Sequence, residues 1–165
     1  MPHLKLMKLM YLAERESMKL SGFPMMSDRL VSLKHGPVLS QTFNHINDMA
    51  PSAQFGGWDS WISDKAENKV ALVKPLNADD LDELSRADLT ILGYVWDRCG
   101  HMTKYQIRDY THRADICPEW RYPGDSMLPI SYADVFVALG YSADQAAEMA
   151  AEVEAQHAID AALAA

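Results

Sequence analysis

Four side chains in the second half of the sequence are of the types that bind zinc. They are Cys99, His101, His112 and Cys117, and they follow the spacing C-x-H-x10-H-x4-C. Zinc accepts thiolate and imidazole ligands, but structural zinc sites usually carry their ligands in closely spaced pairs. Core cysteines and ordinary histidines are the simpler explanation. We therefore expect no bound metal and no other cofactor, and these four residues are the only candidate metal ligands.

A further histidine stands in the segment SLKHGPV, residues 32–38. His35 on a sharp turn could act as a general base, but no neighbouring side chain marks a catalytic unit around it. Gly is accepted at a helix N-cap, and Pro is favoured at the first helical position. The apolar residues Leu39, Phe43 and Ile46 then recur at i, i+4 and i+7. We therefore predict that Gly36-Pro37 starts a helix.

The remaining sequence carries no strong catalytic motif. It contains no phosphate-binding glycine loop, nucleophile elbow or H-E-x-x-H helix. The acidic cluster at 79–83 is better explained as a solvated helix start than as a metal site. We predict no catalytic residue and no enzymatic activity, and we favour a protein that acts by binding.

The first structural element is a helix near 4–20 that ends at Gly22-Phe23-Pro24. Apolar side chains cover most of its circumference, which is typical of a helix that packs on several sides. Its polar positions form one stripe: Lys5, Lys8, Arg15, Glu16 and Lys19. After a loop at 50–58, residues 58–73 alternate in a way that indicates a β-hairpin, with a polar turn at 64–68.

Four possible helix caps mark the starts of helices in the C-terminal half. A capping residue stands three positions before a possible reciprocal partner at Ser85 and Asp88, Thr103 and Gln106, Ser131 and Asp134, and Ser142 and Gln145. These pairs predict helices near 86–99, 104–112, 132–139 and 143–163, although the first could begin earlier, near Asn77. The expected fold is mainly α with a small β-hairpin, a single compact helical domain of about six helices.

The chain is acidic, with a formal net charge of −8. The charge is +2 over residues 1–50, −4 over 51–100 and −6 over 101–165. Such a surface disfavours nucleic acid and anionic membranes, since both need basic side chains. It suits a basic protein partner, or it serves solubility alone. No segment is typical of a secretion signal or a membrane span, so we expect a cytoplasmic protein.

Three segments, in this order and spacing, resemble the Panacea domain of SocA-like antitoxins, which also occurs in phage-associated proteins. They are LKLMKLMYLAE at 4–14, SLKHGPV at 32–38, and THRADICPEW at 111–120 followed by ISYADVFVALG at 130–140. The resemblance spans about residues 2–140. It implies a mostly helical domain that binds and neutralises a toxin encoded in the same operon, without catalysis. A protease or a chaperone is a candidate second partner.

The resemblance also implies a set of residues that either bind the partner or hold the fold together. These are Lys34, His35, Gly36, Pro37, Val38, Thr111, His112 and Trp120. Helix starts and a buried indole would explain Gly36, Pro37 and Trp120 structurally. We expect residues 1–140 to form the Panacea-like domain and 141–165 an alanine-rich acidic helix, part of it or appended to it. A metal-dependent hydrolase and a DNA-binding autorepressor are the alternative functions.

Overall fold

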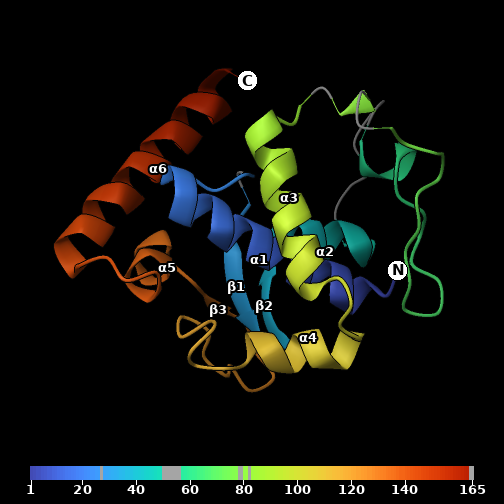
Figure 1. The fold of residues 1–165 in the computed structure, drawn as a ribbon, viewed down its shortest axis with the longest axis horizontal. Coiled ribbons are helices and arrows are strands. Elements are labelled where there is room, and N and C mark those ends of the chain that lie inside the picture. The colour runs from blue at the N-terminus through green and yellow to red at the C-terminus, as the bar shows by residue number, and fades with distance from the viewer. Residues whose placement is uncertain (27, 50–56, 78–79, 82, 164–165) are drawn as a thin grey trace.

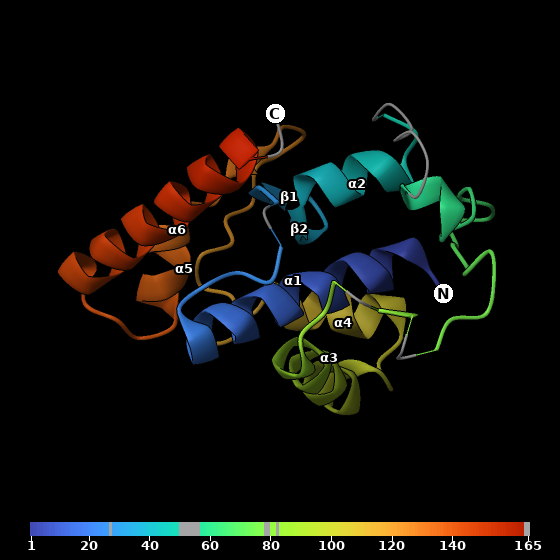
Figure 2. The same ribbon diagram turned by 90° about the horizontal axis from the view of Figure 1, so that it is seen from above.

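Helix α1 (His3–Ser21) runs through the middle of the molecule (Figure 1). Helices α3 (Arg86–Cys99) and α4 (Lys104–Thr111) lie on one side of it, and the sheet and α2 (Ser40–Ile46) lie on the other (Figure 2). The helix ends as predicted at Gly22, whose φ of 80° is left-handed and whose N–H donates to the Met18 carbonyl. The expectation that α1 packs on several sides is therefore confirmed.

The computed structural model describes residues 1–26, 28–49, 57–77, 80–81 and 83–163. Within these ranges it has six α-helices, one short 3₁₀ helix and a three-stranded antiparallel sheet. The expected fold class, mainly α with a small β element, is confirmed. In the same ranges, no helix is both long enough and apolar enough to cross a membrane.

The sheet lies where we predicted a helix start. Strands β1 (Leu30–Leu33), β2 (Gly36–Leu39) and β3 (Leu128–Pro129) follow the order β2-β1-β3, and the register pairs Leu33 with Gly36. The prediction that Gly36-Pro37 begins a helix was wrong. Gly36 has a φ of 100°, whereas Lys34 and His35 do not have positive φ, so the glycine closes a hairpin turn.

Helix α2 begins only at Ser40, after β2 has ended. Pro37 is compatible with β2 because this strand is at the sheet edge, where a missing N–H is tolerated. The start of α2 is capped from a distance, since the Asp28 carboxylate accepts hydrogen bonds from the N–H groups of Gln41 and Thr42 at 2.8 and 2.9 Å. A carboxylate at a helix N-terminus is also favoured by the helix dipole.

The predicted hairpin at 58–73 is reduced to isolated bridges. Residues Trp58–Ser60 form a 3₁₀ helix, and the segment then folds back through antiparallel bridges between Ile62 and Leu72 and between Ala66 and Lys69. A lone hairpin is marginal unless further strands or helices support it. The predicted loop at 50–58 lies outside the described residues except for its last two positions.

The four predicted caps all form. In each case the hydroxyl of the capping Ser or Thr accepts a hydrogen bond from the backbone N–H of the residue three positions later. The side chain of that later residue accepts a hydrogen bond from the backbone N–H of the capping residue. Helices α3, α4, α5 (Tyr132–Ala138) and α6 (Ala143–Leu163) start accordingly at 86, 104, 132 and 143. Ser85 is thus the N-cap of α3 and does not lie inside a longer helix.

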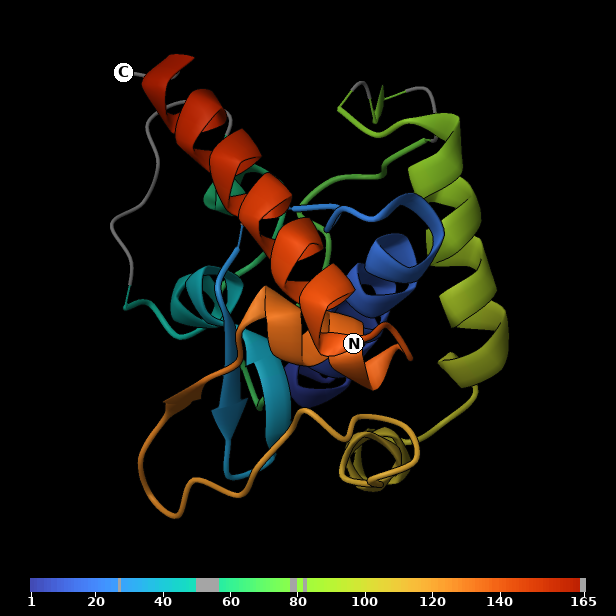
Figure 3. The same cartoon turned by 90° about the vertical axis from the view of Figure 1, so that its left-hand side faces the viewer.

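Helix α6 packs on α5 and crosses one side of the molecule (Figure 3). Its buried residues are Ala146, Ala150 and Val153. The Met149 side chain reaches the Gly22 turn that ends α1. Most other side chains of α6 are exposed, including its five acidic ones, so this helix contributes a narrow apolar stripe to the core and a wide acidic surface to the outside.

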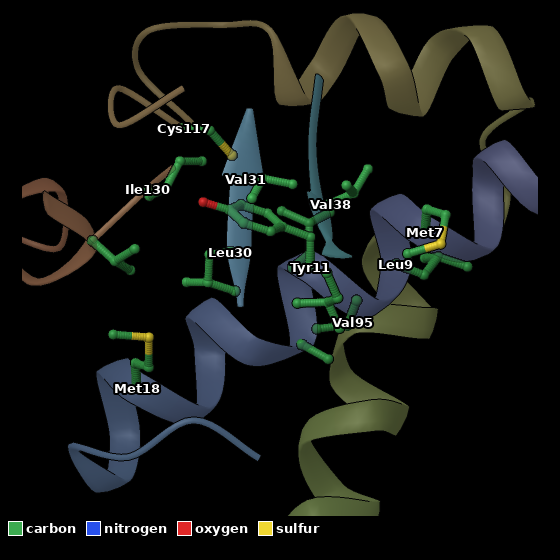
Figure 4. Packing of buried hydrophobic residues seen from close by; sticks show 14 of the residues in the cluster. Met7, Leu9, Tyr11, Met18, Leu30, Val31, Val38, Val95, Cys117 and Ile130 are labelled. Atoms are coloured by element: carbon green, nitrogen blue, oxygen red, sulfur yellow. The ribbon is translucent and has the colours of Figure 1, made fainter. Parts of the chain in front are cut away.

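The core forms between α1, the sheet and α3. Figure 4 shows Tyr11 of α1 pointing past Val31 toward Cys117 and Ile130. The Tyr11 side chain is fully buried, and so is that of Met18. Each large apolar side chain buried in this way contributes about 1.5–3 kcal/mol to folding. The core therefore depends mainly on one helix that meets every other layer.

Buried polar groups tie the irregular segment 113–127 to α1. The Tyr11 hydroxyl donates to Oε1 of Glu119 at 2.8 Å, and Nε of Arg15 lies 2.6 Å from the same oxygen. Burial raises the pKa of Tyr11 well above its usual value, so the phenol stays protonated and can donate. The predicted polar stripe of α1 is thus only partly exposed, because Lys8 and Arg15 point inward and find partners there.

We expect Glu119→Ala to destabilise the protein strongly. The substitution leaves the Arg15 charge buried without its partner and the Tyr11 hydroxyl without an acceptor, a loss of about 3–5 kcal/mol. Asp115→Ala in the same segment is the control, since Asp115 pairs with Arg113 at the exposed surface. Its unfolding midpoint in urea should match that of the wild type. Equal midpoints for the two variants would contradict the buried network.

Candidate functional site

The turn between β1 and β2 packs closely against Lys8 of α1 and His112 at the end of α4. A Cβ atom on Gly36 would lie 3.0 Å from Nζ of Lys8 and 3.1 Å from the ring of His112. Such distances are tighter than most contacts of a methyl group, so Lys8 or His112 would have to shift by a few tenths of an ångström, and the φ of 100° is unfavourable for any side chain. Glycine therefore lets α1 and the end of α4 approach the turn closely without strain.

His112 and Trp120 pack against the turn as a pair of stacked rings. Their rings stack with centroids 4.1 Å apart and planes within 1° of parallel. The indole Nε1 of Trp120 donates a hydrogen bond of 3.1 Å to the Leu33 carbonyl, the last residue of β1. The stack is thus attached to one strand of the hairpin, and it fixes where the turn sits.

Lys8 forms a hydrogen bond with the other strand of the hairpin, β2. Its Nζ donates a hydrogen bond of 2.7 Å to the Pro37 carbonyl, and the side chain has no exposed surface. Burial lowers the pKa of Lys8 to about 7, against a smaller opposing effect of the nearby Cys117. Among the described residues, no Asp or Glu side chain forms an ion pair with it. At neutral pH Lys8 is therefore only partly protonated, and in the described part of the chain no carboxylate balances the charge of its protonated form.

The neighbouring titratable groups are shifted by the same surroundings. Burial lowers the pKa of His112, the charge of Lys8 lowers it further, and the His35 backbone opposes these effects. Burial raises the pKa of Cys117 to about 12, so this thiol stays protonated. The titratable groups that act electrostatically on Lys8 thus include an uncharged imidazole and an uncharged thiol.

A cavity of about 300 Å³ opens beside this arrangement. It lies between the first turns of α1, the hairpin tip, α2 and residues 124–126. Its walls include the apolar side chains of Leu4, Met7, Leu33, Val38 and Phe43, together with Lys8. At its mouth Lys34 pairs with Asp125 at 3.0 Å, and both side chains are largely exposed. The site is thus a cavity with apolar walls and an exposed ion pair at its mouth, and Lys8 lies behind its wall without accessible surface.

The motif residues form two groups around the turn, one exposed at its tip and one buried or partly buried near its base. Lys34 and His35 are exposed at its tip, whereas Gly36, Pro37 and Val38 are buried in β2. Thr111 is fully buried and donates from Oγ1 to the Arg108 carbonyl at 2.9 Å. His112 and Trp120 lie beneath the turn as described. Segments about 75 residues apart along the chain thus converge on one hairpin.

The family model described as "Antitoxin SocA-like, Panacea domain" matches residues 6–121. The chain belongs to this family. The match covers more than two thirds of the sequence, from the first turn of α1 to the residue after Trp120. No curated protein and no solved structure matched the chain. The cluster around Gly36 therefore lies inside the Panacea domain, whereas α5 and α6 lie outside the matched range.

The candidate zinc ligands of this Panacea domain do not converge. Cys99 and Cys117 are buried free thiols, and His101 is exposed just after α3. His112 is occupied by its stack on Trp120. Over the described ranges, no group of three or more His, Cys, Asp or Glu side chains is arranged to hold a metal ion.

Two residues at the centre of the Panacea domain were missed by sequence reasoning. Lys8 was counted as part of a polar stripe, although its position between Met7 and Leu9 is a signal of burial. Glu14 accepts hydrogen bonds from the N–H groups of Met25 and Met26 at 2.7 and 3.0 Å. Burial raises the pKa of Glu14 to about 8, against those two bonds, which lower it.

We expect Gly36→Ala to destabilise the domain by an amount on the order of 1–3 kcal/mol, because alanine is strained at positive φ and its methyl group would meet Lys8 and His112. Gly93→Ala is the matched control. Gly93 lies on the exposed face of α3 with nothing near its missing Cβ, so alanine should stabilise the helix by about 0.5–1 kcal/mol. Opposite shifts in urea denaturation confirm the packing, whereas shifts of the same sign contradict it.

We expect Lys8→Met to keep the fold and to change how stability depends on pH. The folded state holds Lys8 with a pKa of about 7, while the unfolded chain has the usual value near 10.5. Between these values the unfolded state binds more protons, so this residue's destabilising effect is complete below pH 7 and fades toward pH 10.5. The gain of the methionine variant over wild type should therefore be larger at pH 6.5 than at pH 9.5. A gain that is independent of pH, measured by urea denaturation, would contradict the burial of a charged Lys8.

Proposed function

We propose that this protein is a cytoplasmic antitoxin that neutralises a cognate protein toxin, encoded in the same operon, by stoichiometric binding and without catalysis. The observation that carries the proposal is membership of the SocA-like Panacea family over residues 6–121. An antitoxin of this kind needs a stable scaffold and a complementary surface, and it needs no catalytic group. A protease or a chaperone is a second partner to test.

The exposed tip of the β1–β2 turn is the contact that we propose for the toxin. Lys34 and His35 project from a turn whose two strands are held at the Leu33 and Pro37 carbonyls. A turn fixed in this way loses little conformational freedom when it binds, which favours affinity. The salt bridge from Lys34 to Asp125 also gives the tip a defined orientation.

Helix α6 offers the second candidate surface. Its exposed carboxylates are Asp144, Glu148, Glu152, Glu154 and Asp160. A basic toxin would be attracted to them, and such an attraction weakens with added salt. This surface lies outside the matched Panacea range, so we regard it as an addition to the turn and not as its replacement.

The observations give less support to the two other functions. Helix α1 carries the basic stripe that a DNA-recognition helix would need, but it lies in the middle of the fold with Lys8 fully buried. A hydrolase would need a grouped set of ligands or catalytic side chains, and the four candidate zinc ligands are dispersed. We therefore base the experiment on protein binding.

The test is co-expression with the toxic product of the neighbouring reading frame. We expect the wild type to restore growth and to form a complex of fixed stoichiometry by native mass spectrometry. Lys34→Glu should abolish protection by reversing the charge at the contact. Lys19→Glu is the control, because the two lysines have nearly equal side-chain exposure, 53% and 54%. It should protect as well as the wild type.

A third variant, deletion of residues 143–165, tests the acidic helix. Protection that survives Lys34→Glu but is lost on deletion would move the contact from the turn to α6. If no neighbouring toxic product is neutralised by the wild type and none forms a complex with it, the antitoxin proposal is wrong. Circular dichroism of each variant verifies that the fold is intact.

A further inference from the structure

The last part of helix α6 extends beyond the core of the molecule. In the described range of this helix Val153 is the last buried residue, and the helix continues to Leu163. Figure 3 shows this end of α6 projecting past α5. Two of its apolar side chains, Ile159 and Leu163, are exposed by 54% and 82%. Because helices in proteins are stabilised mainly by the packing of one face, this end of α6 offers a face that a partner can cover.

A groove of about 820 Å³ lies between this end of α6, the sheet and the start of α2. Glu154, His157 and Asp160 of α6 line one side of it. Several apolar side chains also line the groove, and those contributed by β1 and by the segment around β3 are Leu30, Val31, Met127, Pro129 and Ile130. The groove therefore combines an apolar surface with a polar helical wall.

Tyr132 joins the two sides of the groove at its base. Its hydroxyl donates a hydrogen bond of 3.0 Å to the Asp28 carbonyl, just before β1. The ring of His157 packs edge-on against the Tyr132 ring, with centroids 5.5 Å apart and planes at 73°. The end of α6, the start of α5 and the segment before β1 are thus connected without a partner. A preformed groove of this kind loses little conformational freedom on binding.

The α6 side of the groove carries negative charge. Glu154 and Asp160 are exposed, whereas the buried Asp28 carboxylate already accepts N–H groups at the start of α2. Among the described lining residues, Arg29 is the one lysine or arginine, and it lies on the opposite side. Residues 122–165, which include α6, contain seven Asp or Glu residues and no Lys or Arg. This side of the groove therefore attracts basic groups and repels acidic ones.

We propose that this groove binds a segment of the cognate toxin in which Lys or Arg residues alternate with apolar ones. The inference rests on the proposed antitoxin function, because it assigns the segment to the toxin. The basic side chains of the segment pair with Glu154 and Asp160, and its apolar side chains contact the apolar lining. The volume of the groove suits a short stretch of polypeptide.

Strand β1 connects the groove to the hairpin turn. Its first residue, Leu30, lines the groove, and its last residue, Leu33, precedes the turn. Three residue steps along a strand span about 10 Å. A toxin surface of ordinary size can therefore contact the groove and the exposed tip at Lys34 together.

A second copy of this chain fits the groove less well. The chain has a stretch of alternating basic and apolar character, LKLMKL at residues 4–9. That stretch lies in α1 at the centre of the fold, and Lys8 is fully buried. A second copy could therefore offer it only by unfolding. Nucleic acid is disfavoured as well, because its phosphates would be repelled by Glu154 and Asp160.

The experiment uses the peptide acetyl-Leu-Arg-Leu-Arg-Leu-amide as the probe, titrated into the full-length wild-type protein and followed by ¹H–¹⁵N NMR. We expect the backbone amide resonances of Leu30, Ile130 and His157 to shift. A matched peptide with Glu in place of both Arg residues should bind about tenfold more weakly, because two attractions become repulsions. A peptide with Ala in place of Leu should also bind more weakly, since it buries less apolar surface. Equal binding of the Arg and Glu peptides overturns the proposal, and this comparison needs no variant to fold.

Two double variants test the groove against the general charge of α6. Glu154→Lys with Asp160→Lys should remove the preference for the Arg peptide and the protection against the toxin in co-expression. Glu148→Lys with Glu152→Lys is the control, because it changes the net charge equally at exposed positions of the same helix that do not line the groove. The control should bind the peptide and protect as the wild type does. Equal losses in the two double variants contradict a specific groove.

The outcomes separate this inference from the antitoxin function. If the wild type and the groove variant neutralise the toxin equally well, the groove assignment is wrong and the antitoxin function stands. If the wild type neutralises no toxin, the antitoxin function is wrong, and so is the assignment of the segment to a toxin. A wild-type dimer in analytical ultracentrifugation that the groove variant dissociates would assign the groove to a second copy and overturn the proposal.

Discussion

A helix at the centre of a fold must find a partner for every polar side chain that it buries, and this requirement organises the whole protein. Lys8 binds the β2 carbonyl of Pro37, Glu14 accepts the N–H groups that follow the helix, and Arg15 lies against Glu119. These side chains of α1 lie up to two turns apart and reach three different segments. Helix α1 therefore positions strand β2, the loop after α1 that contains Met25 and Met26, and the irregular segment 113–127. The apolar core fills the space between these contacts.

Features that depend on neighbours in sequence could be predicted, whereas features that depend on distant contacts could not. The caps at Ser85 and Thr103 need only residues three positions away, so their helices begin where the sequence indicated. Gly36-Pro37 suits either a helix start or a hairpin turn, and the choice depends on pairing with β1. Strand β3 exists because Val31 pairs with Pro129 across nearly a hundred residues, a contact without any local signal. The burial of Lys8 is likewise a property of the assembled fold.

The candidate site has the same origin. The motifs at 32–38 and 111–120 could be recognised as a set, but their meeting point could not, because it depends on Trp120 reaching Leu33 and on Gly36 admitting Lys8 and His112. The hairpin is anchored on both strands by contacts from outside the sheet. A turn held at both sides is rigid at its base and presents an exposed tip, and recognition loops on rigid scaffolds generally have this arrangement. The turn lies within residues 6–121, the range that the family model matches.

The outer edge of the sheet has a consequence for how the protein behaves in a crowded cell. Strand β3 forms that edge with only two residues, and one of them, Pro129, has no N–H to offer. Unpaired edges are templates on which other chains add strands, and short strands that contain proline remove that opportunity. The opposite edge strand, β2, packs against α1, α2 and α4. The β3 edge of this small sheet therefore offers few backbone groups to a second copy for strand addition.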